Sequence, residues 1–255
     1  MRLLRSALFN LGFYFLVVVL MIAALPALAQ GGAAIEWHAR RWARLSLALL
    51  ERTCGTKVEF RGLENLPPGA ALVAAKHQST LDVLALILAV ERFSFIYKHE
   101  LDMLPLFGSY LRSCGQISID RSKRAGVLAQ IIAAADQTFA VDRRLVIFPE
   151  GTRRPVGAPP LYKAGVARIV EATGAPCVPV ALNSGLFWPR RRFIRRPGTM
   201  VIEFLPPLTV EAGKGAFMQV LQTRIEAASD RLIAEALAKD ASLATPTTTP
   251  QLSRS

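Results

Sequence analysis

The spacing of hydrophobic positions changes near residue 54 and divides the chain into two parts. Residues 6–35 contain no charged side chain, and the densest apolar stretch covers residues 7–25. As a helix this stretch would be about 28 Å long, close to the ~30 Å hydrocarbon core of a bilayer. Pro26 and the pair Gly31 and Gly32 follow it and predict a turn. The first part therefore predicts one apolar helix that ends in a turn.

A second helix is predicted over residues 37–50, and its composition is different. It carries basic and apolar side chains on one helix, as is typical of a helix that lies in a lipid headgroup layer. The members are Arg40, Arg41, Arg44, Trp37, Trp42, Leu45 and Leu49. This second helix supports membrane attachment of the first 53 residues.

Three arrangements of this amino-terminal part remain open. Arg2, Arg5 and the stretch Ala27-Leu28-Ala29 suggest a cleaved signal peptide, but the apolar run exceeds the usual signal core of about 7–15 residues. A transmembrane anchor fits the length of the run. A re-entrant hairpin or shallow insertion fits the arginines on both flanks, because it keeps both flanks on the cytoplasmic side.

Beyond residue 54, short apolar runs alternate with longer stretches of helical spacing. This alternation predicts an α/β fold, with a mostly parallel central sheet flanked by helices, after the amino-terminal membrane-associating helices. Strands are expected at 58–61, 71–75, 93–97, 116–120, 145–149, 178–182 and 200–205. Helices are expected at 80–90, 104–113, 123–140, 163–173 and 216–239. The predicted organisation is residues 1–53 for the anchor, 54–240 for the α/β domain and 241–255 for a disordered tail rich in Thr, Ser and Pro.

The amino-acid composition limits the class of protein and the kind of surface that it binds. The 255 residues include 31 Lys and Arg against 19 Asp and Glu, a formal charge of +12, and 52% are hydrophobic. Such an apolar chain is not wholly disordered, and a single long apolar run does not make a polytopic transporter. The positive charge points to an anionic surface, either membrane or nucleic acid. Cys54, Cys114 and Cys177 are odd in number and far apart, which favours buried free thiols over a disulfide framework or a zinc site.

The most informative polar residues follow the predicted strands, where parallel α/β sheets bind their ligands. His77 and Asp82 come after strand 71–75 and are five positions apart. Across a strand–helix junction the two side chains can meet, giving a general base oriented by a carboxylate. The alternative is structural, because Ser79 and Asp82 also match a capping box at a helix start.

Cations follow two further strands. Arg121 lies at a predicted helix start and suits a phosphate, or else it pairs with Asp120. After strand 145–149, Arg153 could offer a planar fork of donors to a phosphate, while Glu150 could hold an arginine or a substrate hydroxyl. Lys163 is a further candidate anion contact, with a solvated surface lysine as its alternative.

Two other features concern the sheet and the partners. Pro179 inside strand 178–182 predicts a sheet edge or a strand end. The loop 188–198 mixes five arginines with aromatic residues and favours anionic lipid over nucleic acid, because no nucleic-acid motif accompanies it. The chain also lacks a Gly-x-Ser-x-Gly elbow, a Walker loop and a Gly-x-Gly-x-x-Gly motif, so it offers no convincing covalent nucleophile.

Four sequence boxes in a row resemble those of the glycerolipid acyltransferases. They are His77-Gln78-Ser79-Thr80-Leu81-Asp82, Gly115-Gln116-Ile117-Ser118-Ile119-Asp120-Arg121, Phe148-Pro149-Glu150-Gly151-Thr152-Arg153 and Val178-Pro179-Val180. All four stand in the family order over residues 76–183. Within the family the chain is most similar to bacterial 1-acyl-sn-glycerol-3-phosphate acyltransferases. It departs from the usual pattern at Leu81, where an aromatic residue is common, and at Ser118, where a larger apolar residue is usual.

The resemblance implies a direct acyl transfer to lysophosphatidic acid. His77 would be the base and Asp82 its orienting partner, without a metal. The implied substrate-binding residues are Arg121, Glu150, Gly151, Thr152, Arg153 and Lys163. Acyl-CoA or acyl-carrier protein would be the donor co-substrate, with no other cofactor. The implied location is the cytoplasmic face of an inner membrane with anionic lipids. Alternatives are a related enzyme for another lyso-lipid, such as a lyso-ornithine lipid, and a non-catalytic lipid-binding protein.

Overall fold

A seven-stranded sheet forms the centre of the protein in the computed structural model, which describes residues 1–120, 126–209 and 214–244. The strand order is β1-β7-β6-β2-β5-β3-β4, and every pairing is parallel except that between β6 and β7. The strands are β1 (Thr56–Arg61), β2 (Ala71–Ala75), β3 (Phe93–Lys98), β4 (Ile117–Ile119), β5 (Arg144–Ile147), β6 (Cys177–Leu182) and β7 (Gly198–Phe204). The predicted α/β class with a mostly parallel sheet is confirmed.

Two adjacent strands in the middle of the sheet position the site. In the β2–β5 ladder Ala71 pairs with Arg144 and Ala74 with Ile147, so both strands end at the same level. All five residues of β2 are fully buried, as expected for a strand covered on both faces. The segments that follow β2 and β5, which carry His77 and Glu150, therefore leave the sheet side by side.

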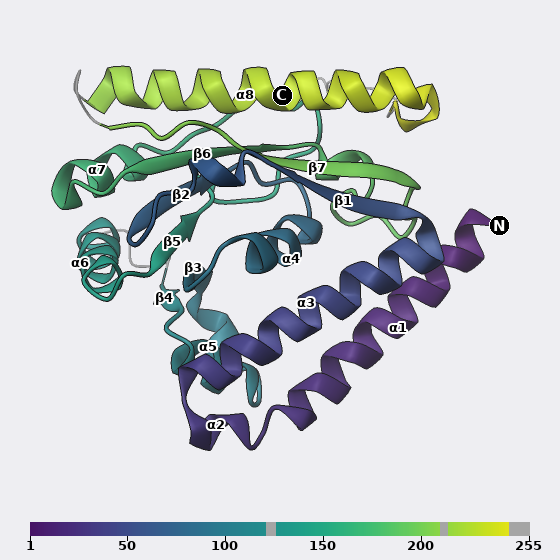
Figure 1. Ribbon diagram of the computed structural model, residues 1–255, viewed down its shortest axis with the longest axis horizontal. Helices are drawn as coiled ribbons and strands as arrows, with labels where there is room; N and C mark the ends of the chain where they lie inside the picture. The colour runs from purple at the N-terminus through teal and green to yellow at the C-terminus, as the bar shows by residue number, and fades with distance from the viewer. Residues whose placement is uncertain (121–125, 210–213, 245–255) are drawn as a thin grey trace, which may run out of the picture.

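Helices cover both faces of the sheet (Figure 1). On one face, α6 (Val127–Phe139), α7 (Gly165–Thr173) and α8 (Lys214–Lys239) pack against Leu72, Ala74 and Leu145. On the other face, α4 (Thr80–Ala89) packs against Val73 and Val146, and α5 (Phe107–Ser113) lies nearby. Side chains that alternate along β2 thus contribute to two separate cores.

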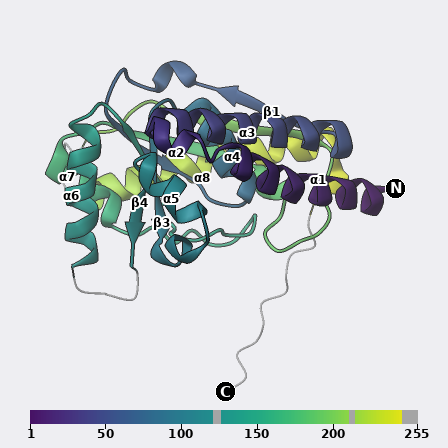
Figure 2. The ribbon, with the colours of Figure 1, turned by 90° about the horizontal axis from the view of Figure 1, so that it is seen from below.

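The amino-terminal part forms a helical hairpin along the α4 side of the sheet (Figure 2). It consists of α1 (Arg2–Ala23), the short α2 (Ala27–Gln30) and α3 (Gly32–Cys54). Gly12 lets the two long helices approach closely, because a β-carbon there would lie 2.8 Å from a methyl group of Leu49. The turn predicted near residues 26–32 is confirmed. The first helix begins earlier than the predicted residue 7 and ends at Ala23, before the predicted residue 25, whereas α3 extends beyond its predicted range at both ends.

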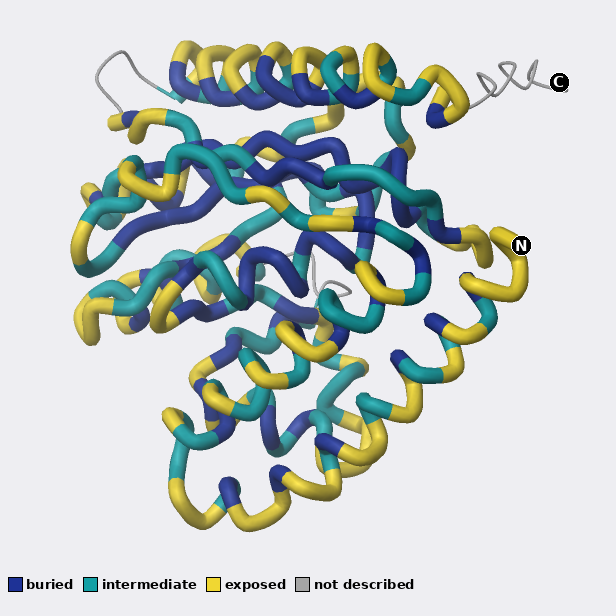
Figure 3. Tube along the Cα trace, turned by 45° about the vertical axis from the view of Figure 1, so that its right-hand side comes forward, coloured by how far each residue is buried: buried dark blue, intermediate teal, exposed yellow. Residues whose placement is uncertain are grey.

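Both faces of α1 are largely apolar. Phe9, Phe13 and Leu20 face the protein and are buried. On the opposite face a row of large apolar side chains is exposed along the edge of the molecule (Figure 3). That row is Leu3, Leu4, Leu8, Leu11, Tyr14, Phe15, Val18, Val19 and Ile22. Within the described residues α1 is the one helix that is long and apolar enough to cross a membrane.

Pro179 does not mark a sheet edge, because β6 lies between β7 and β2. The sheet tolerates it through a bulge. Cys177 forms a bridge with Leu208, whereas Val180 pairs with Phe204, so the β7 side has one residue more than the β6 side over this span. The missing N–H of Pro179 falls at this irregular place, and its carbonyl still accepts from Leu205 N at 2.9 Å.

Other boundaries differ in detail. The helix predicted from residue 123 begins at Val127, and residues 121–125 lie outside the described part of the chain. The boundary of the predicted tail at residue 241 coincides with a 3-10 turn, Ala241–Leu243, whose Leu243 is buried. Residues 245–255 are not described. Three further 3-10 turns, Leu63–Asn65, His99–Met103 and Ser184–Leu186, connect the main elements.

Candidate active site

The junction between β2 and α4 brings His77 against Asp82. The Nδ1 atom of His77 lies 2.9 Å from Asp82 Oδ2. Asp82 is fully buried, whereas 14% of the His77 side chain is exposed. Because Nδ1 is occupied by the carboxylate, Nε2 is the ring nitrogen left to meet a substrate. The predicted contact between the His77 and Asp82 side chains is confirmed.

The same carboxylate also caps α4, so the structural interpretation of Asp82 holds as well. Its Oδ2 atom accepts from Gln78 N at 2.7 Å and from Ser79 N at 2.8 Å. Ser79 Oγ accepts in turn from Leu81 N, which completes a capping box. The cap fixes the helix start, and the helix start fixes the orientation of the histidine.

His77 is held on its ring face by Phe148, the first residue of the third box. The two ring centroids are 3.8 Å apart and the planes differ by 15°. Arg154 N also donates to the carbonyl oxygen of His77 at 2.8 Å. The segment after β5 therefore restrains both the backbone and the ring of the candidate base.

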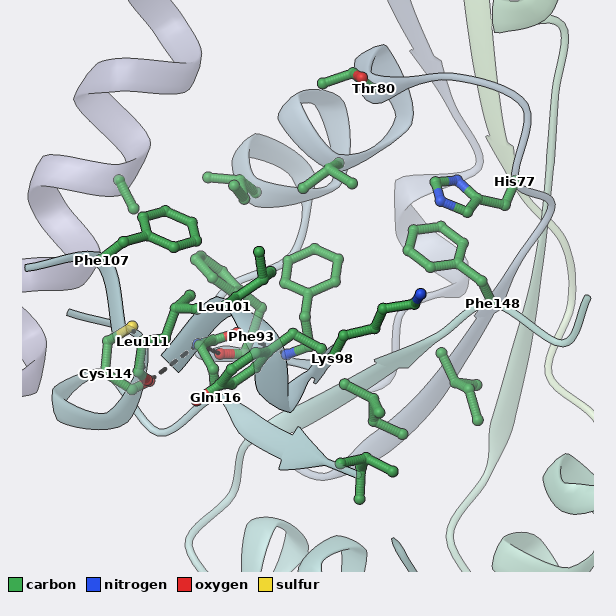
Figure 4. Close-up of a pocket in the computed structure, with 18 of the residues that line it drawn as sticks. His77, Thr80, Phe93, Lys98, Leu101, Phe107, Leu111, Cys114, Gln116 and Phe148 are labelled. Atoms are coloured by element: carbon green, nitrogen blue, oxygen red, sulfur yellow. Dashed lines mark hydrogen bonds between the residues drawn. The ribbon is translucent and has the colours of Figure 1, made fainter. Parts of the chain in front are cut away.

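His77 lies at one end of a long cavity of about 1010 Å³. In Figure 4, His77 and Phe148 are at one end, and Phe107, Leu111 and Cys114 are at the other. Apolar side chains from several elements form most of the wall, including Val17 and Leu20 of α1, Trp42 of α3, Val83 and Ile87 of α4, and Phe93 and Ile96 of β3. A cavity of this size and polarity suits a long hydrocarbon chain.

Arginine side chains line the cavity at the same end as His77. Arg153 lines the cavity, and its Nη1 donates to Thr80 Oγ1 at 2.9 Å, which directs the guanidinium toward the His77 box. Burial, and then the nearby charge of Arg190, lowers the pKa of Arg153 from its ordinary value. The structure therefore places a partly desolvated cation beside the candidate base.

The remaining predicted substrate-binding residues in the described part of the chain divide into two groups. Gly151, Thr152 and Lys163 line the cavity together with Arg153. Gly151 has φ +65°, and a β-carbon there would lie 3.0 Å from Lys163 Nζ, so the lysine approaches the turn closely. Lys163 N donates to the carbonyl oxygen of Pro149 at 3.0 Å, which closes the loop between them.

Glu150, by contrast, does not line the cavity. It is buried, and its Oε1 lies 3.3 Å from Lys76 Nζ. Lys76 also contacts Glu226 of α8, and Tyr162 donates to the same Glu226 oxygen at 2.7 Å. Burial raises the pKa of Glu150, and the Lys76 charge opposes that rise. The residue thus fastens the β5 turn to β2, and its predicted part in acceptor binding would be indirect.

The structure adds residues to the site that sequence reasoning did not select. Thr80 orients Arg153, Lys76 anchors Glu150, and both Lys98 and Arg190 line the cavity. Thr80 lies inside the first box and Lys76 directly precedes it, and this position was the available signal for both. Arg190 lies in a run of arginines without internal distinction, so its sequence position carried no such signal. Arg121, the remaining predicted phosphate contact, lies outside the described residues.

Metal-binding chemistry is not evident in the described part of the chain. No group of three or more His, Cys, Asp or Glu residues there could hold an ion. Cys54, Cys114 and Cys177 are buried and free.

The two departures from the family pattern have structural roles. Ser118 donates to Asp102 Oδ2 at 2.6 Å, and Leu81 is fully buried in the core.

Comparisons with known proteins agree on one family. The Acyltransferase family matches residues 57–183. The 1-acyl-sn-glycerol-3-phosphate acyltransferase of Pseudomonas aeruginosa is 33% identical over 77% of this chain and 76% of its own length. The mouse 1-acyl-sn-glycerol-3-phosphate acyltransferase alpha is 29% identical over 76% and 69%. The crystal structure of the 1-acyl-sn-glycerophosphate acyltransferase of Thermotoga maritima has a TM-score of 0.77 and 22% identity, covering 91% of this chain and 98% of that one.

Proposed function

Because this chain belongs to the acyltransferase family, we propose that it moves a fatty acyl group from an acyl thioester to the free hydroxyl of 1-acyl-sn-glycerol-3-phosphate, giving phosphatidic acid. The observation that carries the proposal is the His77–Asp82 pair, 2.9 Å apart, at the polar end of a long apolar cavity. The base, the cations and the hydrocarbon space are the three parts that this reaction needs.

His77 acts as the general base. Nδ1 donates to Asp82, and Nε2 takes the hydroxyl proton as the acceptor oxygen attacks the thioester carbonyl carbon. The tetrahedral intermediate then collapses, the carbon–sulfur bond breaks, and the imidazolium returns the proton to the thiolate. Asp82 stabilises the transient positive charge on the ring. A thioester is already activated, so the transfer needs no covalent enzyme intermediate.

The donor co-substrate is acyl-CoA or acyl-carrier protein. Both present a thioester on a long flexible arm and carry negative charge, which the formal charge of +12 attracts. The cavity next to His77 accommodates the acyl chain, since its far end is lined by Phe107, Leu111 and Cys114. No other cofactor enters the proposed reaction.

The membrane supplies the acceptor and holds the enzyme. The exposed apolar row on α1 is suited to the hydrocarbon layer, while Arg41, Arg44 and Arg52 of α3 are suited to anionic headgroups. Cavity-lining residues of α1 and α3 would place the mouth of the cavity at the lipid surface. The proposed location is the inner membrane, with the catalytic part on its cytoplasmic face.

The test is an acyl-transfer assay with the purified protein in mixed micelles. Acyl-CoA and acyl-carrier protein are each offered with a panel of acceptors: 1-acyl-sn-glycerol-3-phosphate, other lysophospholipids and a lyso-ornithine lipid. We expect phosphatidic acid as the main product. A higher kcat/KM with a lyso-ornithine lipid would assign a different acceptor, and lipid binding without transfer to any acceptor would favour a non-catalytic lipid-binding protein.

A further inference from the structure

Arg190 has a fixed position at the polar end of the cavity, although it lies outside all four sequence boxes. It follows the buried Trp188, whose carbonyl oxygen accepts from Ser79 Oγ at 2.7 Å. Arg192 N donates to the carbonyl oxygen of Pro189, and Arg191 has φ +57°, so a tight turn surrounds Arg190. A positive φ is unfavourable for arginine, which indicates that tertiary contacts hold the turn in this form.

The hydrogen bonds of Arg190 tie it to Arg153 and leave most of its donors free. Its Nη1 donates to the main-chain oxygen of Arg153 at 2.9 Å. Its Nε is buried and has no hydrogen-bond partner. In the described part of the chain, no carboxylate lies within salt-bridge distance of Arg190 or Arg153, although the charge of the buried Asp82 favours the charged form of Arg153. Each guanidinium has five N–H donors, so the pair presents several unused donors at one place.

Two neighbouring cations that lack a salt-bridge partner are electrostatically unfavourable until an anion arrives, and Asp82 offsets this only in part. Burial, followed by the charge of Arg190, lowers the pKa of Arg153, while the charge of Asp82 opposes this lowering. Planar guanidinium groups bind phosphate oxygens through paired hydrogen bonds, and partial burial strengthens those bonds. We propose, resting on the function proposed above, that Arg190 and Arg153 together form a phosphate site, with Arg190 as its second arginine.

The phosphate could come from the acceptor or from the donor, and the location favours the acceptor. Arg153 is bonded to Thr80, three residues after His77, and all three line the same cavity. The acceptor carries its phosphate and its reactive hydroxyl on one glycerol, so its phosphate must lie close to the base. The phosphates of CoA or of phosphopantetheine are separated from the thioester by the length of the pantetheine arm. A phosphomonoester also carries close to two negative charges at neutral pH, which matches two arginines.

The test compares R190Q and R190K with R224Q, a matched control that removes an exposed arginine from α8. KM and kcat are measured in mixed micelles for 1-acyl-sn-glycerol-3-phosphate and for the phosphate-free 1-acylglycerol, with acyl-CoA constant. We expect R190Q to raise KM for the phosphorylated acceptor by roughly ten- to a hundredfold, with a much smaller change for the phosphate-free acceptor. R190K should restore part of the loss, and R224Q should behave as wild type.

Two outcomes overturn the inference. Equal losses for both acceptors would make Arg190 a structural residue. A defect that appears with acyl-CoA and disappears with a phosphate-free acyl thioester, such as acyl-N-acetylcysteamine, would assign the phosphate to the donor. If the wild-type enzyme transfers to no acceptor, the proposed function fails separately. Direct binding of 1-acyl-sn-glycerol-3-phosphate to wild type and R190Q then decides the phosphate site, and equal affinities would overturn it.

Discussion

One oxygen atom of Asp82 accepts three hydrogen bonds, from His77 Nδ1, Gln78 N and Ser79 N. Because the two backbone donors belong to the start of α4, the carboxylate is fixed before it meets the imidazole. The same contacts therefore fix the start of α4 and, in the proposed mechanism, orient the base. This arrangement explains why the capping box and the contact between His77 and Asp82 are both present in the structure.

Replacing the candidate base separates these two roles. We expect His77→Ala to lower kcat by roughly 10²-fold or more, because general base catalysis typically contributes 10²–10⁴-fold. The capping box does not use the imidazole, so the unfolding midpoint should change little. Steady-state kinetics and thermal unfolding measure the two effects. Near-normal turnover in the variant would refute the base assignment.

Glu150 should leave a signature in the pH dependence of stability. Burial raises its pKa in the folded state, so the folded protein holds this proton more tightly than the unfolded chain. The contribution of Glu150 to stability should then fall as pH rises from the unfolded-state pKa, about 4.3, toward the folded-state value. Glu150→Gln lacks this loss, so its stability relative to wild type should increase with pH in that window. Chemical unfolding of both proteins between about pH 4 and 6 measures this difference. If the free energies of unfolding of wild type and Glu150→Gln change in parallel with pH, the prediction is wrong.

At the scale of elements, the segment after β6 joins the amino-terminal helix to the catalytic box. Arg195 is buried and lies 4.3 Å from the ring centroid of Trp188. Its Nη2 donates to Asn10 Oδ1 at 2.7 Å, and its backbone N donates to Ser6 Oγ at 2.9 Å. Burial lowers the pKa of Arg195 to about 10. Since Trp188 also accepts from Ser79, one continuous set of contacts runs from α1 to the start of α4.

We expect Arg195→Ala to destabilise the protein by about 1–3 kcal/mol, because it removes a desolvated cation–π contact and a charged hydrogen bond. Denaturant unfolding in detergent measures this change. Arg192→Ala is the control, since Arg192 is exposed in the same loop and should change stability by less than about 0.5 kcal/mol. Equal effects of the two substitutions would show that Arg195 does not fasten α1.

At the scale of the molecule, the hairpin and α8 lie on opposite sides of the sheet (Figure 1). The α1–α3 side carries the exposed apolar row and contributes walls to the cavity. The α8 side has few exposed large apolar residues in its described part, with Val220 as one example. This asymmetry gives the protein one face suited to lipid and one suited to water.

A charge on the apolar face should weaken membrane binding. We expect Leu11→Glu to lower the affinity for anionic lipid vesicles by at least about tenfold, because Leu11 is 74% exposed and a carboxylate there must leave water. Val220→Glu, on α8, is the matched control. Vesicle co-sedimentation measures the lipid binding of both variants, after unfolding measurements have shown that the two are equally stable. Unchanged binding by Leu11→Glu would exclude α1 as the lipid-facing element.

The sheet was only partly predictable from the sequence, because the sequence indicates the strands but not their order. The sequence indicates where each strand lies through its apolar run, and boundaries differ from the structure by a few residues. The place of β6 inside the sheet was not predictable, because Pro179 lacks the N–H that an interior strand needs. A bulge between Phe204 and Leu208 lets the sheet accept a proline in β6. The bulge lies in the partner segment, so the proline by itself did not predict it.

The sequence by itself determined whatever depends on neighbours along the chain. His77 and Asp82 meet within five residues, the capping box fixes the turn between them, and the apolar length of α1 is a property of one segment. Tertiary structure alone decided the rest. Lys76 meets Glu226 across 150 residues, Arg153 meets Arg190 across 37, and the cavity draws its walls from both the hairpin and the sheet. Many long-range partners are compatible with one local pattern, and packing of the whole chain selects among them.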